Sequence, residues 1–263
     1  MFSPSILISS LLLLSHTTPI LAACSRADLL AAASKFVTAV SSGTVASLPL
    51  SSNFTYRENN KASTLAKSAP YTSALKIDLS RSTADTVACA TYTLIVASTG
   101  NKPFVLATQL RFGEGGDPST ISLIDTIAAT TGSLFFNAPK TLGYLRNESW
   151  ADIAVEAQRP SRDLLKKVGD AYLDMWTDKN AADSIPWGTD CERVEGSQYT
   201  RPCGGSLPRG GSAKNNGDRR YVIDEVVGSV DVLCSFDSLG SLPDSHEIRV
   251  EGGKVKYVHT VTV

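Results

Sequence analysis

Two of the three histidines lie near the C-terminus and flank a tight turn. Gly252 and Gly253 separate two alternating segments, which predicts a two-residue β-hairpin. Pairing outward from that turn places His246 opposite His259, with Tyr257 beside them. Because side chains alternate across a strand, this register puts all three on one mostly apolar face. Histidine is the usual proton donor and acceptor at neutral pH, so the hairpin predicts an acid–base site inside the fold.

A second group of candidates surrounds two aligned proline steps, Leu48-Pro49 and Ile185-Pro186. Arg193 is a candidate to hold an anionic or enolic oxygen through charge-assisted hydrogen bonds. Trp187, Tyr172 and Tyr56 are candidates for substrate contacts. Three structural alternatives stay open. The histidines form a satisfied or solvent-facing pair, the arginine forms a surface ion pair with a neighbouring glutamate, and the aromatic residues belong to an ordinary core.

Other kinds of chemistry lack a recognisable pattern. No His-Glu-x-x-His segment, phosphate loop or Gly-x-Ser-x-Gly elbow occurs, so we expect no metal site and no cofactor. The net charge is −1 and no basic block stands out, which argues against a nucleic-acid partner. An apolar content of 42% is enough for a packed core and excludes wholesale disorder.

The N-terminus predicts export. Residues 1–23 carry no charged side chain, contain an apolar run at 6–14 and end in small residues, which is typical of a signal peptide cleaved before Cys24. An uncleaved anchor or a buried apolar arm is the alternative. Residues 24–263 hold no segment that could span a membrane. We therefore expect the secretory pathway lumen or the exterior, with N-linked sugar at the sequons of Asn53 and Asn147.

The chain contains five cysteines, an odd number, so at least one is a free thiol or pairs between chains. Cys191 and Cys203 lie in a segment rich in glycine, serine and proline, which favours a local disulfide bond. Cys24 with Cys89 is the next pairing to expect. The connectivity of these two with Cys234 stays open at the level of sequence.

An internal repeat divides the chain. Asp-Leu-Leu at residue 28 recurs at 163, Glu58 aligns with Glu195, and Leu-Arg-Phe at 110 aligns with Ile-Arg-Val at 248. Because the matches keep their order, we predict a signal peptide at 1–23, repeats at 24–131 and 161–263, and an apolar tie segment at 132–160 that packs across both. At the places of the two histidines, the first repeat has Thr108 and Asp125.

Each repeat begins with an amphipathic helix and continues in strands. The apolar spacing predicts helices around residues 29–40 and 165–176, with Ser25 and Asp28 forming a capping box. Alternation predicts strands at 86–97, 104–112 and 121–129, and at 221–227, 230–236, 245–251 and 254–263. A helix followed by a meander is α+β, and a curved antiparallel sheet around a helix makes a cone with an open mouth suited to a small molecule.

These segments resemble a known arrangement, two tandem copies of the NTF2-like (cystatin-like) α+β fold in a family of secreted fungal proteins. The resemblance rests on Phe135-Phe136-Asn137-Ala138, Glu148-Ser149-Trp150, Arg159-Pro160-Ser161-Arg162, Ala171-Tyr172-Leu173-Asp174, Ile185-Pro186-Trp187 and the segment from Asp190 to Gly196. It also implies similarity to the hetero-Diels–Alderases of tropolone–sesquiterpenoid biosynthesis.

The resemblance implies an enzyme of secondary metabolism, a cofactor-free cyclase or isomerase that orients small apolar natural products. The expected reaction is a Diels–Alder-type cycloaddition that joins a quinone-methide-like polyketide to a terpene. A secreted protein that binds a small molecule without transforming it is the alternative, and a homodimer is one expected assembly. Convergence of polar residues in one cone is the discriminating feature: a pocket that holds His246, Tyr257 and His259 favours the enzyme, whereas two collapsed cones favour the binding protein.

Overall fold

The computed structural model describes residues 24–100, 102–113 and 117–263, so the predicted signal peptide lies outside the described residues. The first half begins with α1 (Arg26–Ser42) and continues with β1 (Leu50–Glu58), β2 (Lys61–Ser63), β3 (Leu79–Asp85), β4 (Ala90–Ala97), β5 (Phe104–Gly113) and β6 (Asp117–Thr130). The tie segment carries α2 (Ala138–Leu145). The second half has α3 (Arg162–Asp174), β7 (Trp187–Glu195), β8 (Gln198–Thr200), β9 (Gly217–Asp224), β10 (Ser229–Phe236), β11 (Leu242–Glu251) and β12 (Lys254–Thr262).

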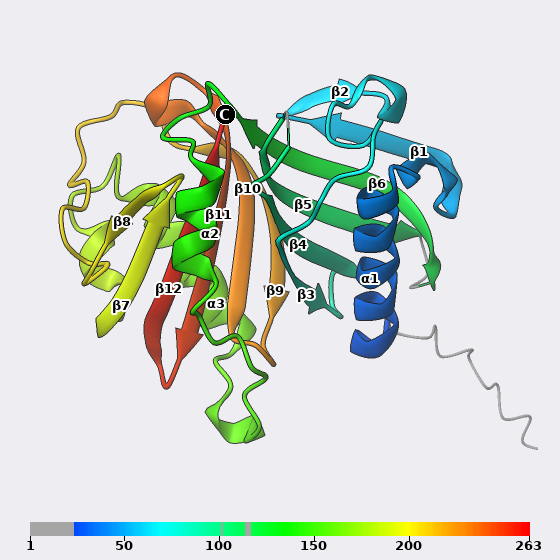
Figure 1. The fold of residues 1–263 in the computed structure, drawn as a ribbon. Helices are drawn as coiled ribbons and strands as arrows, with labels where there is room; N and C mark the ends of the chain where they lie inside the picture. The colour runs from blue at the N-terminus through cyan, green and yellow to red at the C-terminus, as the bar shows by residue number, and fades with distance from the viewer. Residues whose placement is uncertain (1–23, 101, 114–116) are drawn as a thin grey trace, which may run out of the picture.

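Two six-stranded sheets and a few helices confirm the α+β class. The two sheets have the same strand order. The order is β2-β1-β6-β5-β4-β3 in the first and β8-β7-β12-β11-β10-β9 in the second (Figure 1). The expectation of purely antiparallel sheets is wrong, because β1 pairs with β6 and β7 with β12 in parallel. Each parallel pair forms because the strand that follows the helix returns beside the last strand of its half.

Two strand boundaries differ from the sequence prediction for the same reason. The segment at 86–97 holds a turn before β4, and the one at 221–227 ends as a strand at Asp224. Asp85 accepts hydrogen bonds from the backbone N–H groups of Val87 and Ala88, and Asp224 does the same for Val226 and Val227. An aspartate that bonds the backbone two and three residues ahead closes a turn and ends the strand.

The cap expected at Ser25 is present, and the second helix begins in the same way. The Ser25 hydroxyl accepts a hydrogen bond from the backbone N–H of Asp28, and the Ser161 hydroxyl accepts one from Leu164. The helix α1 ends at Gly43, which has φ of 70°, and a Cβ there would lie 2.6 Å from the backbone nitrogen of Ala74. Only glycine fits a left-handed turn with so close a neighbour.

Three apolar cores hold the halves. One lies between α1 and the first sheet, the second between α3 and the second sheet, and the third between the two sheets. The third explains why β4 is buried on both faces, since Tyr92 and Leu94 face the shared core while Ile95 faces the first. Leu142 of α2 also packs in the shared core, so the tie segment contacts both halves.

Reciprocal ion pairs join the halves at the contact of β3 with β9. Arg26, the first residue of α1, donates to the buried carboxylate of Asp224 in β9 at 3.1 Å. Arg162, the first residue of α3, donates to the buried carboxylate of Asp85 in β3 at 2.7 and 2.9 Å. The start of each helix is therefore anchored to the opposite sheet.

Both expected disulfide bonds are present, Cys24–Cys89 and Cys191–Cys203, and Cys234 is a buried free thiol. This pairing is compatible with an oxidising compartment. Among the described residues, none of the helices has the length and apolar character that a membrane crossing requires.

Candidate functional site

The C-terminal hairpin has a β-bulge that changes the predicted register. Glu251 pairs with Lys254 and Val250 with Val255 as expected, but the register then shifts by one residue. Consequently His246 pairs with Thr260 and not with His259. Because a slip of one residue moves a side chain to the other face, the two histidines lie on opposite faces of the second sheet, and the prediction that they face each other is wrong.

His259 belongs to a buried polar cluster between the halves and the tie segment. Its Nε2 atom lies 2.8 Å from a carboxylate oxygen of Glu148, and its Nδ1 atom lies 3.1 Å from one of Glu247. Burial lowers the pKa of His259, but the two carboxylates outweigh burial and raise it above its usual value. Both ring nitrogens of His259 therefore have carboxylate partners, as in a histidine that stabilises the fold.

Tyr257 lies in the same cluster. Its ring stacks on Trp150 with a centroid separation of 5.6 Å, and its hydroxyl accepts a hydrogen bond from the backbone N–H of Ser149 at 3.3 Å. Arg81 of the first half also contacts Trp150, with its guanidinium carbon 3.6 Å from the centroid of the indole ring. Tyr257 and His259 therefore remain together as predicted, in a contact between the halves.

His246 faces the opposite side, toward α3. Its ring lies 5.2 Å from that of Tyr172, 5.9 Å from Phe236 and 6.4 Å from Trp176, measured between centroids. The residue is 1% exposed. Among the described residues, neither ring nitrogen has a well-aligned hydrogen-bond partner. A buried imidazole with a free nitrogen is a group available to a ligand.

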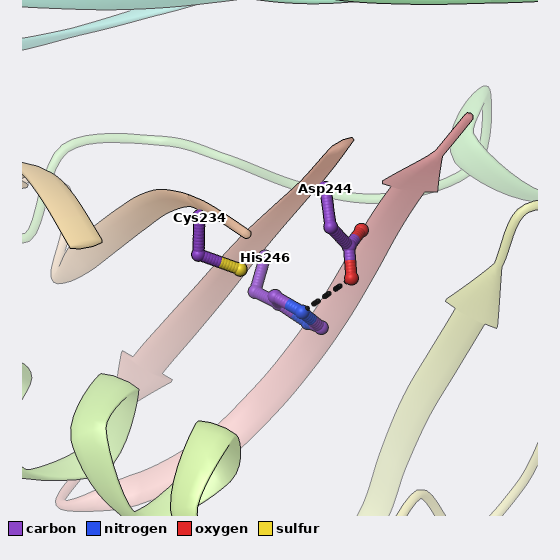
Figure 2. Close-up of side chains that lie close together, drawn as sticks. All are labelled: Cys234, Asp244 and His246. Atoms are coloured by element: carbon purple, nitrogen blue, oxygen red, sulfur yellow. Dashed lines mark ion pairs between the residues drawn. The ribbon is translucent and has the colours of Figure 1, made fainter. Parts of the chain in front are cut away.

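Asp244 lies beside His246 and is held in place. One of its carboxylate oxygens accepts hydrogen bonds from the Thr262 hydroxyl and the Ser245 N–H, both at 2.9 Å. The other lies 2.8 Å from Nε2 of His246, at ion-pair distance though poorly aligned for a hydrogen bond. Figure 2 shows Asp244 and Cys234 converging on the imidazole from neighbouring strands. A carboxylate at one nitrogen leaves the other nitrogen as the proton acceptor.

A cavity of about 150 Å³ opens in front of this pair. We call it the His246 pocket, and its lining combines apolar side chains with the polar pair: Phe135, Trp176, Phe236, Asp244, His246 and Thr260. Phe135 comes from the tie segment and Trp176 from the turn that follows α3, while the others come from strands β10 to β12. A cavity of this volume accepts a molecule of the size of one six-membered ring.

The corresponding space in the first half is filled. Counting strand pairs outward from the β3–β4 and β9–β10 turns places Thr108 where the second half has His246. The hydroxyl of Tyr71 lies 2.9 Å from that of Thr108 and 2.8 Å from that of Thr126, and the tyrosine is 3% exposed. Tyr71 thus closes the interior of the first half.

The grouping of Cys234, Asp244 and His246 has no counterpart at the matching places of the first half. At the places of Cys234 and Asp244, the same strand pairs put Ile95 and Leu106 in the first half. The connection between β8 and β9, which corresponds to the one carrying Tyr71, adds no residue to the pocket lining. Of the three residues expected together in an enzyme pocket, His246 lines this one, whereas Tyr257 and His259 do not.

The remaining predicted site residues are dispersed around the His246 pocket or far from it. Arg193 is buried, donates to the carbonyl of Gly205 at 2.9 Å, and does not line the pocket. Tyr172 packs against His246 and donates to Glu195, a pocket residue, at 3.0 Å. Burial and then the charge of Glu195 raise the pKa of Tyr172 far above its usual value, so it remains a neutral donor.

Trp187 and Tyr56 do not reach the pocket. The indole of Trp187 contacts Tyr172 edge-on at 6.3 Å and donates to the carbonyl of Ala182. Tyr56 lies in the first half, where its hydroxyl bonds Ser68 at 2.8 Å. The sequons of Asn53 and Asn147 are both exposed, which leaves their glycosylation a prediction.

Cys234 and Asp244 are the residues that the sequence reasoning missed. Asp244 and His246 are two residues apart in one strand and must share a face, a signal that the alternation rule contains. Burial, and then the neighbouring charge of Asp244, raise the pKa of the Cys234 thiol, so it is no nucleophile at neutral pH. Cys234, Asp244 and His246 are the residues that could hold a metal ion, since their donor atoms lie within 4.8 Å of one another.

Comparison with known proteins adds one match. Residues 158–262 match a family described as a domain of unknown function, DUF8021. The matched segment contains α3, the second sheet and the Cys234, Asp244 and His246 cluster. No curated protein matches the chain.

Proposed function

We propose that the second half is an enzyme that moves a proton on a small, largely apolar molecule, with His246 as the base. The observation that supports it is the Asp244–His246 pair at the wall of a pocket whose lining also includes three aromatic side chains, Phe135, Trp176 and Phe236. A tautomer with hydrogen on Nε2 donates toward Asp244 and leaves the lone pair of Nδ1 free. The carboxylate then stabilises the imidazolium that forms.

The substrate is a compound with an acidic C–H bond next to a carbonyl group, or a β-hydroxy carbonyl compound. Removal of the proton gives an enolate and an imidazolium. The imidazolium then returns the proton, either to another carbon of the enolate in an isomerisation or to the departing hydroxyl group, which leaves as water, in a dehydration. Thr260 is a neutral hydroxyl donor in the same lining for the substrate oxygen. The aromatic side chains exclude water and so strengthen each electrostatic contact.

The volume of the His246 pocket favours a reaction of one small molecule. A cycloaddition that joins a polyketide to a terpene needs room for two partners, whereas about 150 Å³ holds a single ring. Isomerisation, dehydration or internal cyclisation therefore fits better, and the intermolecular cycloaddition is the second reading. The tandem NTF2-like assignment belongs to the same proposal and is supported by two halves that each wrap a six-stranded sheet around a helix.

The proposed setting is the secretory pathway or the exterior, with the two disulfide bonds as its support. Sugar at Asn53 and Asn147 is part of this proposal, because both asparagines are exposed. Treatment of protein purified from a eukaryotic host with an N-glycosidase, followed by mass spectrometry, tests it. An unmodified mass before treatment argues against export by this route.

Deuterium exchange tests the chemistry without knowledge of the natural substrate. Small cyclic ketones such as cyclohexanone and cyclohex-2-enone are incubated in D₂O, and uptake at the carbon next to the carbonyl is followed by NMR. General-base catalysis typically contributes ~10²–10⁴-fold, so His246→Asn should lose about that factor. His259→Gln is the matched control, since this histidine lies on the other face of the sheet.

Three results decide between the functions. Exchange that depends on His246 supports the enzyme. Ketone binding, seen as a change in tryptophan fluorescence, without any exchange favours the protein that only binds small molecules. Equal exchange in wild type and His246→Asn rejects the histidine as base.

A further inference from the structure

The side chains of Cys234, Asp244 and His246 offer three different donor atoms in one buried place. They come from adjacent strands, with Cys234 in β10 opposite Asp244 in β11 and His246 two residues further along. All three are at most 1% exposed. Sulfur, oxygen and nitrogen donors all lie within 4.8 Å of one another.

Two further observations point to a ligand for this cluster. Neither ring nitrogen of His246 and only one oxygen of Asp244 has a well-aligned hydrogen bond within the described part of the chain. Cys234 is the one described cysteine outside a disulfide bond. Buried polar groups are normally paired, so a cluster with several unpaired donor atoms indicates a missing partner.

From this geometry we propose that Cys234, Asp244 and His246 bind one thiophilic divalent cation of the zinc type. Zinc takes sulfur, imidazole nitrogen and carboxylate oxygen at about 2.0–2.3 Å in a tetrahedron, which sets its ligand atoms roughly 3.3–3.7 Å apart. The Nε2 and carboxylate oxygen atoms, now 2.8 Å apart, need to separate by only about half an ångström to reach that spacing.

The charges also balance. Binding displaces the thiol proton of Cys234 to solvent, and the resulting thiolate and the Asp244 carboxylate together neutralise the two positive charges of the cation. A neutral complex suits the surroundings, which are the aromatic rings of Tyr172, Trp176 and Phe236. Hard cations such as magnesium are disfavoured because the cluster has one carboxylate and a sulfur.

The His246 pocket supplies the entry path and the fourth position. Asp244 and His246 line it, so a cation reaches them from the mouth, and water or a small anion completes the tetrahedron from the pocket side. Cation binding stands on this geometry alone. Its consequence rests on the proposed function: a cation on Nε2 and the Asp244 carboxylate leaves the ring hydrogen on Nδ1, which then cannot accept a proton, so the exchange activity falls as the site fills.

Cobalt(II) is the probe, since cobalt bound to a thiolate gives a charge-transfer band in the near ultraviolet. We expect this band in wild type and in His259→Gln, and its loss in Cys234→Ser. Zinc ion should displace the cobalt. Zinc at a hundredfold excess over its Kd should raise the Tm of wild type by roughly 5 °C or more.

The variants separate a lost ligand from a lost fold. Cys234→Ser should weaken zinc binding by about a hundredfold or more, while His246→Asn should keep the thiolate and still lose most of the affinity. Near-ultraviolet circular dichroism checks that each variant is folded. A folded wild type without the band, or the same band in Cys234→Ser, overturns the cation site.

The deuterium exchange assay then tests the consequence separately. Exchange that falls in step with zinc occupancy supports inhibition of the proposed reaction. Unchanged exchange at full occupancy overturns the inhibitory role and the assignment of His246 as base, although the cation site stands. If wild type shows no exchange at all, the cobalt band still decides whether the cation site exists.

Discussion

Asp224 offers a sharp test of how the halves are held together. Its buried carboxylate accepts hydrogen bonds from Arg26 at 3.1 Å and from the backbone N–H groups of Ala84 at 2.9 Å and Val226 at 3.0 Å. Replacing it with asparagine removes the charge opposite Arg26 and turns an N–H₂ group toward donors. Loss of one member of a buried ion pair costs about 3–5 kcal/mol, and the remaining amide oxygen places Asp224→Asn near the lower limit.

The same arginine supplies the control. Arg26 also binds Asp152 at 3.0 Å, but that carboxylate is 56% exposed, so Asp152→Asn should cost under about 1 kcal/mol. Urea unfolding followed by circular dichroism gives both free energies, and calorimetry should show a fall in Tm of roughly 6–12 °C for Asp224→Asn. Equal losses in the two variants would refute the claim that burial makes the reciprocal pairs strong.

Three other outcomes are expected. Tyr71→Ala should cost about 3–5 kcal/mol and open the first half, so that benzene raises the Tm of the variant and not of wild type. His259 has a raised pKa, so its stabilising effect is full below its unfolded pKa of about 6.5 and is lost as pH rises through the higher folded value. The Tm advantage of wild type over His259→Gln should therefore shrink between pH 6 and 9, and a constant difference would contradict this. Cys203→Ser removes a disulfide bond that closes a short loop and should cost about 2–3 kcal/mol by urea unfolding, with no effect on the Cys24–Cys89 bond seen by peptide mapping.

Helices and strands that bury one face could be predicted from the sequence. The helix stripes, the Ser25 cap and strands β5, β6, β10, β11 and β12 follow from apolar spacing, whereas β7 and β8 were not predicted. The matched Leu-Arg-Phe and Ile-Arg-Val segments do occupy equivalent strand positions. Each of these signals is local, so tertiary packing did not change it. Loop composition likewise predicted the Cys191–Cys203 bond. The Cys24–Cys89 bond had no local signal and was expected only as the next pairing among the remaining cysteines.

The hairpin register failed because the second sheet is buried on both faces. Tyr257 and Val258 are adjacent and both buried, so alternation no longer identifies which residue faces the core. The bulge near Lys256 then shifts the pairing without any signal in the residue types. The strand β3, with its polar sequence, was missed because it pairs with β4 on one side only, and its other contacts come from the second half, where the Asp224 carboxylate bonds its backbone.

The candidate site was predictable only in part. His246 and Tyr172 were recognised, but the grouping of His246 with His259 depended on the register, and Asp244 entered only with the structure. The pocket lies in the second half because Tyr71 fills the interior of the first. The position of Tyr71 depends on the path of its loop, which no local sequence pattern indicates.

The reciprocal anchoring of the two helices has a consequence for how the halves can differ. Arg26 with Asp224 and Arg162 with Asp85 form the same contact twice, related by an approximate twofold axis, as in an isologous dimer. Two identical subunits joined in this way must carry identical interiors. In a single polypeptide only the contact between the halves has to keep this symmetry. The interiors can differ, so one is filled by Tyr71 while the other keeps a polar, open pocket. Two halves on one polypeptide can therefore specialise, one supporting the fold and one keeping the pocket. A dimer of two identical subunits cannot specialise in this way.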